Sequence, residues 1–271
     1  MLGTPPALSG EALWLHTGDG ERLRALHIPG PGRDTSLAVI VAHGFTLSTA
    51  REGVRTVMSS LALHAGVIGF DFRGHGGSSG HSTLGQHEVL DLDAAVIEAR
   101  RLGYRDVVTC GWSMGGSVVL RHAALHGGVD AVVSVSALSR WFYKDTPAMR
   151  RVHWTVETRL GRLIAHRAFR TRISAAGWDL DALPEAPVEV VPRISPIPVL
   201  FVHGDRDHYF PIDHPQALYE AAREPKELWL VEGFGHAESA VTPDLLDRIG
   251  AHLPVLVERG RAATAEGRTP Q

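Results

Sequence analysis

A serine between two glycines is the first residue of this chain whose surroundings favour chemistry: Gly-Trp-Ser-Met-Gly at 111–115. An apolar, β-branched run precedes it, and the residues that follow, up to 125, are typical of a helix. We predict a strand, a tight turn with Ser113 at its apex, and a helix. Glycines leave room where a Cβ would collide in such a turn. The N–H groups at the start of the helix would favour negative charge on the serine oxygen.

A serine hydroxyl is a poor nucleophile at neutral pH, so Ser113 needs a base, and that base needs a carboxylate that orients it. In an open parallel sheet, reactive groups gather at the carboxyl ends of the strands. Asp207 and His236 each follow the end of a later apolar run. We therefore predict a nucleophile at Ser113, a base at His236 and an acid at Asp207. The backbone N–H of Met114, directly after the serine, would help to stabilise an oxyanion.

Each of these residues has a simpler interpretation. Ser113 could be an ordinary serine in a glycine-rich turn, because this short pattern also occurs by chance. Asp205 competes with Asp207 as the acid and could instead tie down loop backbone. His208 could suggest a metal, but no cysteine or His-x-x-x-His pattern lies nearby, so we expect none.

The elements that must position these residues alternate between strand and helix patterns. Residues 11–17 and 21–28 predict a β-hairpin around Gly-Asp-Gly. Apolar runs at 37–42, 67–72, 107–110, 129–135, 198–202 and 226–231 predict strands, and helical spacing separates most of them. This order predicts an α/β fold with a mostly parallel sheet of about eight strands and helices on both faces.

The alternation breaks between residues 139 and 195. This stretch is rich in aromatic residues and arginines and is too long for a structureless loop. We predict that residues 1–138 and 196–257 form the core and that residues 139–195 form a small helical cap. The polar residues 258–271 are expected to be a disordered tail.

Composition narrows the class of protein. The chain has 271 residues, of which 44% are hydrophobic and 21% charged, and a net charge of −3. Its basic residues are dispersed, so we expect neither a nucleic-acid partner nor a membrane surface. No apolar run is long enough to span a membrane, no secretion signal is evident, and one cysteine, Cys110, forms no internal disulfide. These features predict a cytoplasmic protein.

Five segments together carry a resemblance to a known family. They are His-Gly-Phe at 43–45, Asp-Phe-Arg-Gly-His-Gly-Gly-Ser at 71–78, Gly-Trp-Ser-Met-Gly-Gly at 111–116, His-Gly-Asp-Arg-Asp at 203–207 and Gly-His at 235–236. Their order and spacing resemble the α/β-hydrolase superfamily in its serine-hydrolase branch, and are similar to carboxylesterases and monoacylglycerol-lipase-like enzymes.

The resemblance implies the α/β-hydrolase fold and a catalytic triad of Ser113, Asp207 and His236. It places the second oxyanion donor at the backbone N–H of Phe45. Family patterns favour Asp207 over Asp205, because Pro211 follows Asp207 four residues on. No carboxylate lies at 136–140, where some relatives carry the acid. By the same resemblance, His43 and His75 support loops.

The resemblance implies hydrolysis of a carboxylic ester, with thioesters or amides as variants, through an acyl-enzyme on Ser113. It also implies a small-molecule substrate and no cofactor. Two alternatives stay open: a receptor-like relative with little turnover, and a cofactor-free haloperoxidase or C–C hydrolase on the same scaffold. Aromatic residues near the site suggest an apolar substrate pocket, although they could equally pack the cap onto the core. These pocket candidates are Trp112, Trp141, Phe142 and Tyr143.

Overall fold

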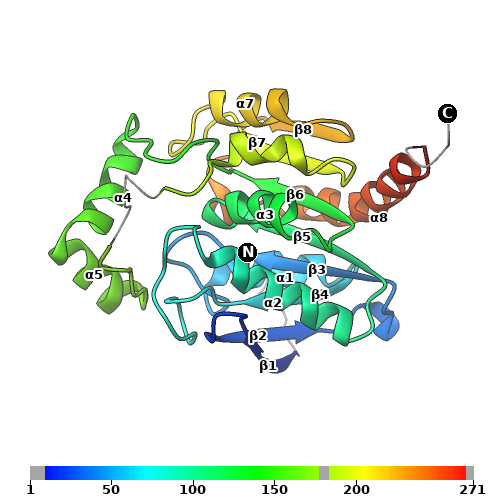
Figure 1. The fold of residues 1–271 in the computed structure, drawn as a ribbon, viewed down its shortest axis with the longest axis horizontal. Coiled ribbons are helices and arrows are strands. Elements are labelled where there is room, and N and C mark those ends of the chain that lie inside the picture. Colours follow the sequence, from blue (N-terminus) through cyan, green and yellow to red (C-terminus); the bar gives the residue numbers. More distant parts are fainter. Residues whose placement is uncertain (1–9, 177–182, 267–271) are drawn as a thin grey trace.

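The computed structural model describes residues 10–176 and 183–266 and contains one eight-stranded sheet (Figure 1). The strand order is β1-β2-β4-β3-β5-β6-β7-β8. The strands are β1 (Glu11–His16), β2 (Arg22–Ile28), β3 (Leu37–Ala42), β4 (Gly66–Phe70), β5 (Asp106–Trp112), β6 (Ala131–Val135), β7 (Val199–Gly204) and β8 (Lys226–Val231).

The sheet is mostly parallel. β2 pairs antiparallel with β1 and β4, and every pair from β4 to β8 along the sheet is parallel. β3 to β7 are buried along their whole length, which explains why their sequences are continuous apolar runs rather than alternating ones. The predicted fold class is confirmed.

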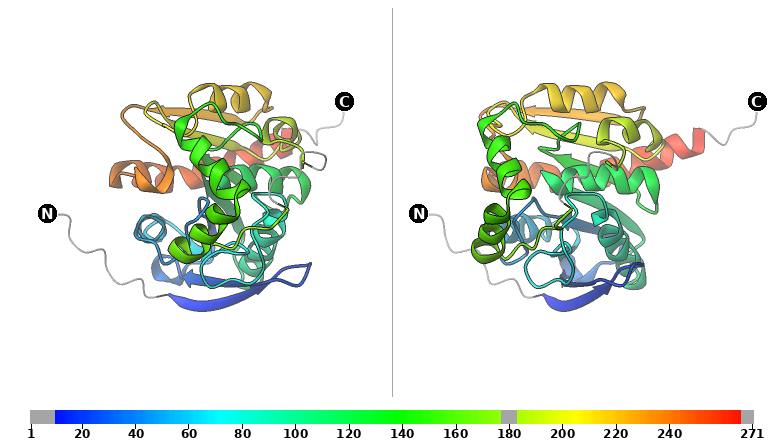
Figure 2. Two further views of the ribbon diagram at one scale, coloured as in Figure 1. Left: turned by 90° about the vertical axis from the view of Figure 1, so that its left-hand side faces the viewer. Right: turned by 60° about the vertical axis from the view of Figure 1, so that its left-hand side comes forward.

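Helices cover both faces of the sheet (Figure 2). α1 (Glu52–Leu61) and α8 (Pro243–Glu266) bury their apolar sides on one face. α2 (Glu88–Arg101), α3 (Met114–Leu125) and α7 (Asp213–Ala221) cover the other. The short α6 (Pro187–Val190) packs against α3 and α7. This three-layer arrangement leaves the carboxyl ends of the parallel strands free for a site.

Two helices between β6 and β7 stand apart from these layers at one end of the molecule (Figure 1). They are α4 (Pro147–Glu157) and α5 (Arg159–Phe169), which we call the α4–α5 segment. Thr146 and Thr158 start the two helices by accepting hydrogen bonds from backbone N–H groups three residues on.

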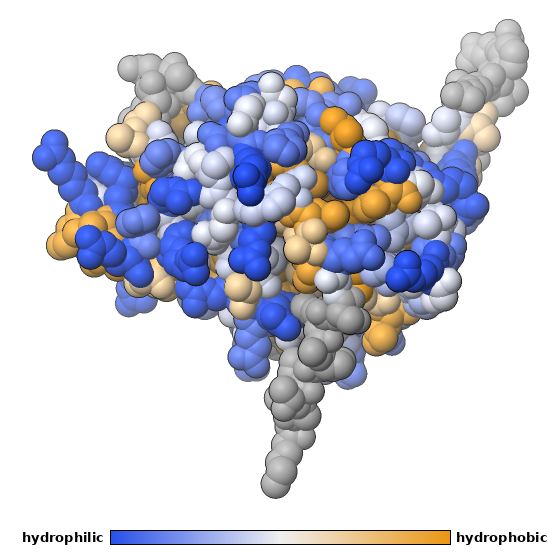
Figure 3. All heavy atoms as spheres, turned by 90° about the horizontal axis from the view of Figure 1, so that it is seen from below, coloured by the Kyte–Doolittle hydropathy of each residue, from blue (hydrophilic) through white to orange (hydrophobic). Residues whose placement is uncertain are grey.

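The surface of the α4–α5 segment mixes apolar and basic side chains. Figure 3 shows apolar side chains among hydrophilic ones at the left end of the molecule, where these helices lie. Its exposed large apolar residues are Trp154, Leu160, Leu163, Ile164 and Phe169. None of the helices within 10–176 and 183–266 is both long and apolar enough to cross a membrane.

The C-terminal region differs from its prediction. Helix α8 continues to Glu266, so the disordered tail predicted from residue 258 is wrong for 258–266. The reason is tertiary: Leu256 and Val257 are buried, and Arg261 forms an ion pair with Asp106 at the start of β5. Composition alone does not show such contacts. The rest of the predicted tail, 267–271, lies outside the described residues.

Candidate active site

Ser113 lies at the apex of the turn between β5 and α3. Its φ of 53° and ψ of −116° are unusual for a residue with a side chain. Its backbone N–H donates to the Val135 carbonyl at 2.9 Å, which ties the apex to β6. A Cβ on Gly115 would lie 2.1 Å from the Ala42 carbonyl oxygen, and one on Gly111 would lie 2.2 Å from that of Gly115. The turn therefore requires glycine on both sides of the serine.

His236 and Asp207 meet Ser113 in one chain of hydrogen bonds. His236 Nε2 lies 2.9 Å from Ser113 Oγ, and His236 Nδ1 lies 2.7 Å from Asp207 Oδ2. The imidazole is also fixed by its neighbours, because the Tyr209 ring lies over it with centroids 4.3 Å apart. The structure thus brings together three side chains from the ends of β5, β7 and β8.

Asp207 is held as a carboxylate. Its side chain is fully buried, which disfavours charge, but His236 and the backbone N–H of Phe210 outweigh burial and lower the pKa of Asp207. Its Oδ1 accepts N–H groups from Tyr209 and Phe210 at 2.8 and 3.0 Å. Asp205, the alternative acid, is exposed and accepts the Gly233 N–H at 2.7 Å. Asp205 therefore secures the turn after β8, away from the imidazole.

The loop after β3 is clamped on either side of Phe45. The Gly44 N–H donates to Glu238 Oε1 at 2.7 Å, and the Thr46 N–H donates to His75 Nε2 at 3.3 Å. The Phe45 N–H between them has no hydrogen-bond partner in the described part of the chain. Met114 opens helix α3, where the first N–H groups lack intrahelical partners. Two main-chain donors are thus available beside Ser113.

His43 and His75 support this loop and are not part of the hydrogen-bonded chain from Ser113 to Asp207. His43 Nε2 accepts the Phe72 N–H at 3.1 Å and its Nδ1 lies 2.7 Å from the Gly44 carbonyl oxygen, so the ring is neutral. Burial, together with the nearby His75, lowers the pKa of His43 to about 4. His75 is fully buried as well, and burial lowers its pKa.

The buried histidines predict that the protein loses stability in mild acid. Burial lowers the pKa of His27, His43, His75, His122, His153, His203 and His214. In the unfolded chain these seven histidines bind protons below about pH 6.5, whereas in the folded protein they do so only at lower pH, so their protonation favours unfolding. For His43 alone the loss at pH 5 amounts to ~2 kcal/mol. Urea unfolding at pH 7.5 and 5.0 measures it; equal stability at both values would contradict the account.

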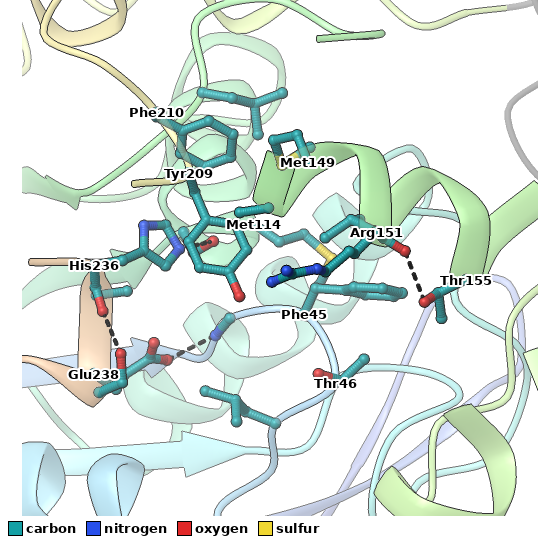
Figure 4. Close-up of a pocket in the computed structure, with 18 of the residues that line it drawn as sticks. Phe45, Thr46, Met114, Met149, Arg151, Thr155, Tyr209, Phe210, His236 and Glu238 are labelled. Carbon is teal, nitrogen blue, oxygen red and sulfur yellow. Dashed lines mark hydrogen bonds between the residues drawn. The ribbon is translucent and has the colours of Figure 1, made fainter. Parts of the chain in front are cut away.

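Glu238 is a site residue that sequence reasoning missed. Its side chain is only 3% exposed, and burial raises its pKa. Glu238 lies two residues after His236 and accepts the Gly44 N–H (Figure 4). It therefore joins the loop that carries His236 to the loop after β3, which we call the donor loop. Gly53 of α1 packs against its backbone, where a Cβ would lie 2.7 Å from the Glu238 carbonyl oxygen. The only hint of this role in the sequence is that a carboxylate follows His236 by two residues.

We predict that Glu238→Ala lowers kcat by about 10- to 100-fold with KM nearly unchanged. Complete loss of one oxyanion donor typically costs 10²–10³, and a misplaced Phe45 N–H should cost somewhat less. Glu238→Gln is the matched control, because an amide oxygen still accepts the Gly44 N–H, and it should retain most of kcat. Steady-state kinetics on an activated ester measure both. An unchanged kcat in Glu238→Ala would show that the clamp is dispensable.

A pocket of about 390 Å³ opens over Ser113 and His236 (Figure 4). Its walls come from the donor loop, the start of α3, helix α4 and the loop after β7. Most of the lining is apolar, and includes Phe45, Leu84, Met114, Leu138, Trp141, Met149, Val152, Phe169 and Phe210. Such a site suits a small molecule with an apolar part.

Only one of the four predicted pocket residues lines this pocket, namely Trp141. Trp112 is fully buried and packs with Val108 and Cys110 toward α1 and α8, because alternate residues of β5 face opposite sides of the sheet. Phe142 and Tyr143 pack instead on His153 and His214, respectively. The structure thus places Trp112, Phe142 and Tyr143 outside this pocket.

Comparison with known proteins places this geometry in a family. The sequence model of the family described as the alpha/beta hydrolase fold matches residues 38–186, which are more than half of the chain. YqkD of Bacillus subtilis is 29% identical over 210 residues, which cover 76% of this chain and 67% of that protein. YfhR of Escherichia coli K12 is 27% identical over 245 residues, covering 87% and 76%.

Among solved structures, the Pyrococcus furiosus esterase Pf2001 has a TM-score of 0.72 to this chain at 23% identity. The likeness covers 93% of this chain and 94% of that one, and it concerns the fold. The chain belongs to the α/β-hydrolase superfamily.

Proposed function

We propose that this protein is a serine hydrolase that cleaves carboxylic esters, with thioesters and amides as chemical variants. The observation that carries the proposal is the hydrogen-bonded chain from Ser113 through His236 to Asp207 beneath an apolar pocket. The family supports it, and so does the similar fold of Pf2001, which is described as an esterase.

In the first half of the reaction, Ser113 Oγ attacks the ester carbonyl carbon. His236 Nε2, 2.9 Å away, takes the hydroxyl proton, and Asp207 stabilises the imidazolium that forms. The carbonyl oxygen becomes an oxyanion, which accepts hydrogen bonds from the N–H groups of Phe45 and Met114. The tetrahedral intermediate then expels the alcohol, to which His236 returns the proton, leaving an acyl-enzyme.

In the second half, water replaces the alcohol. His236 takes a proton from the water as it attacks the acyl carbon, and the same two N–H groups stabilise the second oxyanion. Collapse of this intermediate breaks the bond to Ser113 Oγ, which recovers its proton from His236. The products are a carboxylic acid and the unchanged protein.

The α4–α5 segment acts as the cap in this proposal, within the boundaries 139–195, and residues 1–138 and 196–257 form the core. Helix α4 supplies Met149 and Val152 to the pocket wall, so the cap would set which acyl or alcohol groups fit.

A chain-length series of 4-nitrophenyl esters, combined with labelling by a fluorophosphonate, tests the proposal. We expect many turnovers per protein molecule on short esters and one label per chain. One labelling event without turnover would instead indicate a receptor-like protein. Bromide- and peroxide-dependent halogenation, or cleavage of a diketone without ester turnover, would indicate the other chemistries of this scaffold.

A further inference from the structure

One face of helix α4 carries an arginine into the pocket. Ala148, Arg151, Val152 and Thr155 follow the i, i+3, i+4, i+7 spacing of a single helix face, and all four line the pocket. Figure 4 shows the Arg151 side chain turned into the pocket, with its guanidinium directed between Phe45 and Tyr209. A cation therefore lies in a wall that is otherwise mostly apolar.

The guanidinium of Arg151 has no ion-pair or hydrogen-bond partner within residues 10–176 and 183–266. Other arginines of this region are used by the fold: Arg150 donates to backbone carbonyls, one of them that of Asp145 at 3.0 Å, and Arg162 donates to the Val156 carbonyl at 2.7 Å. The carboxylate that lines the pocket, Glu238, is already engaged with the Gly44 N–H. Arg151 is thus available to a ligand.

The α4–α5 segment, which carries Arg151, has a positive net charge. Helices α4 and α5 together carry five arginines and a single carboxylate, Glu157, although the whole chain has a net charge of −3. Glu157 is itself paired with Lys144 at 2.7 Å. The α4–α5 segment is therefore positive on a protein that is negative overall, and such a segment attracts and steers anions.

We propose that the preferred substrate is an ester that carries a carboxylate, which Arg151 binds while Ser113 attacks the ester carbonyl. A guanidinium suits this task because its planar fork can donate two parallel hydrogen bonds to one carboxylate. Arg151 is exposed in the free protein, so a ligand carboxylate can reach its guanidinium from solvent. The inference rests on the proposed ester hydrolysis and adds the substrate class to it.

Paired substrates of equal size test the proposal. On the acyl side, the 4-nitrophenyl monoester of adipic acid is compared with that of adipamic acid, which ends in a neutral amide. On the alcohol side, 4-acetoxybenzoate is compared with 4-acetoxybenzamide. Each kcat/KM is divided by the hydroxide-catalysed rate constant of the same ester, which removes differences in intrinsic reactivity. We expect the wild-type protein to favour the carboxylate about tenfold in at least one pair.

Variants assign the preference to Arg151. Arg151→Gln should abolish this preference, so that the two members of each pair react at equal normalised rates. Arg150→Gln is the matched control, because it removes the neighbouring arginine that does not line the pocket, and it should keep the preference. High salt should weaken the preference in the wild type.

Equal rates within both pairs for the wild-type protein, or an undiminished preference in Arg151→Gln, would overturn the inference while ester hydrolysis stands. Absence of turnover on every ester, butyrate included, would contradict the proposed function itself.

Discussion

Replacement of Ser113 by alanine should reduce kcat on an activated ester by on the order of 10⁵-fold. The variant keeps the pocket, the N–H donors and the imidazole, but has no nucleophilic oxygen 2.9 Å from His236 Nε2. In serine hydrolases the triad acts as a unit, so removal of its nucleophile costs nearly as much as removal of all three members. Initial rates with 4-nitrophenyl butyrate measure the effect, at protein concentrations high enough to detect the residual rate.

Two controls test whether the loss in Ser113→Ala comes from the missing nucleophile. Thermal unfolding should show the same midpoint for Ser113→Ala within a few degrees, because alanine meets the same unusual backbone angles as serine. His236→Ala combined with Ser113→Ala should be little slower than Ser113→Ala alone. Turnover above one hundredth of the wild-type rate in Ser113→Ala would mean that another residue is the nucleophile.

Replacement of Asp207 by asparagine should reduce kcat by about 10⁴-fold at neutral pH. Asparagine can keep the hydrogen bond to His236 Nδ1 as a donor, which would move the imidazole proton to Nε2, the atom that must accept the Ser113 proton. The His236 imidazolium that forms during the reaction would also lose the negative charge that stabilises it. The pH dependence of kcat, measured between pH 6 and 10, shows whether the loss is largest near neutrality.

The chain provides a matched control for this change two residues away. Asp205→Asn preserves an oxygen that can accept the Gly233 N–H, and its side chain does not contact His236. We expect its kcat to stay within about threefold of wild type. A large loss in Asp205→Asn with a small loss in Asp207→Asn would reverse the assignment of the acid.

The fold was predictable because its main signals are local. Continuous apolar runs are typical of strands buried on both faces, and their alternation with helix patterns leaves few possible topologies. The positions of Ser113, Asp207 and His236 were predictable for the same reason, since each follows the end of a strand. The turn at Ser113 adds a steric requirement for Gly111 and Gly115, which the sequence displays directly.

The pocket wall was less predictable because it depends on tertiary contacts. Trp112 neighbours Ser113 in sequence, yet its side chain faces the opposite layer of the molecule. Glu238 and Arg151 look like surface charges in the sequence, and only the approach of the donor loop and of α4 brings them to the site. Helix α8 likewise extends past residue 258, where Arg261 forms an ion pair with Asp106 of β5.

Trapping of the acyl-enzyme tests the central claim most directly. The protein is mixed with 4-nitrophenyl trimethylacetate, whose bulky acyl group slows deacylation, and is then quenched with acid and mapped by peptide mass spectrometry. We expect a burst of about one 4-nitrophenolate per chain and a trimethylacetyl group on Ser113, both absent from Ser113→Ala. An acyl group on a different residue, or a burst that persists in Ser113→Ala, would contradict the account.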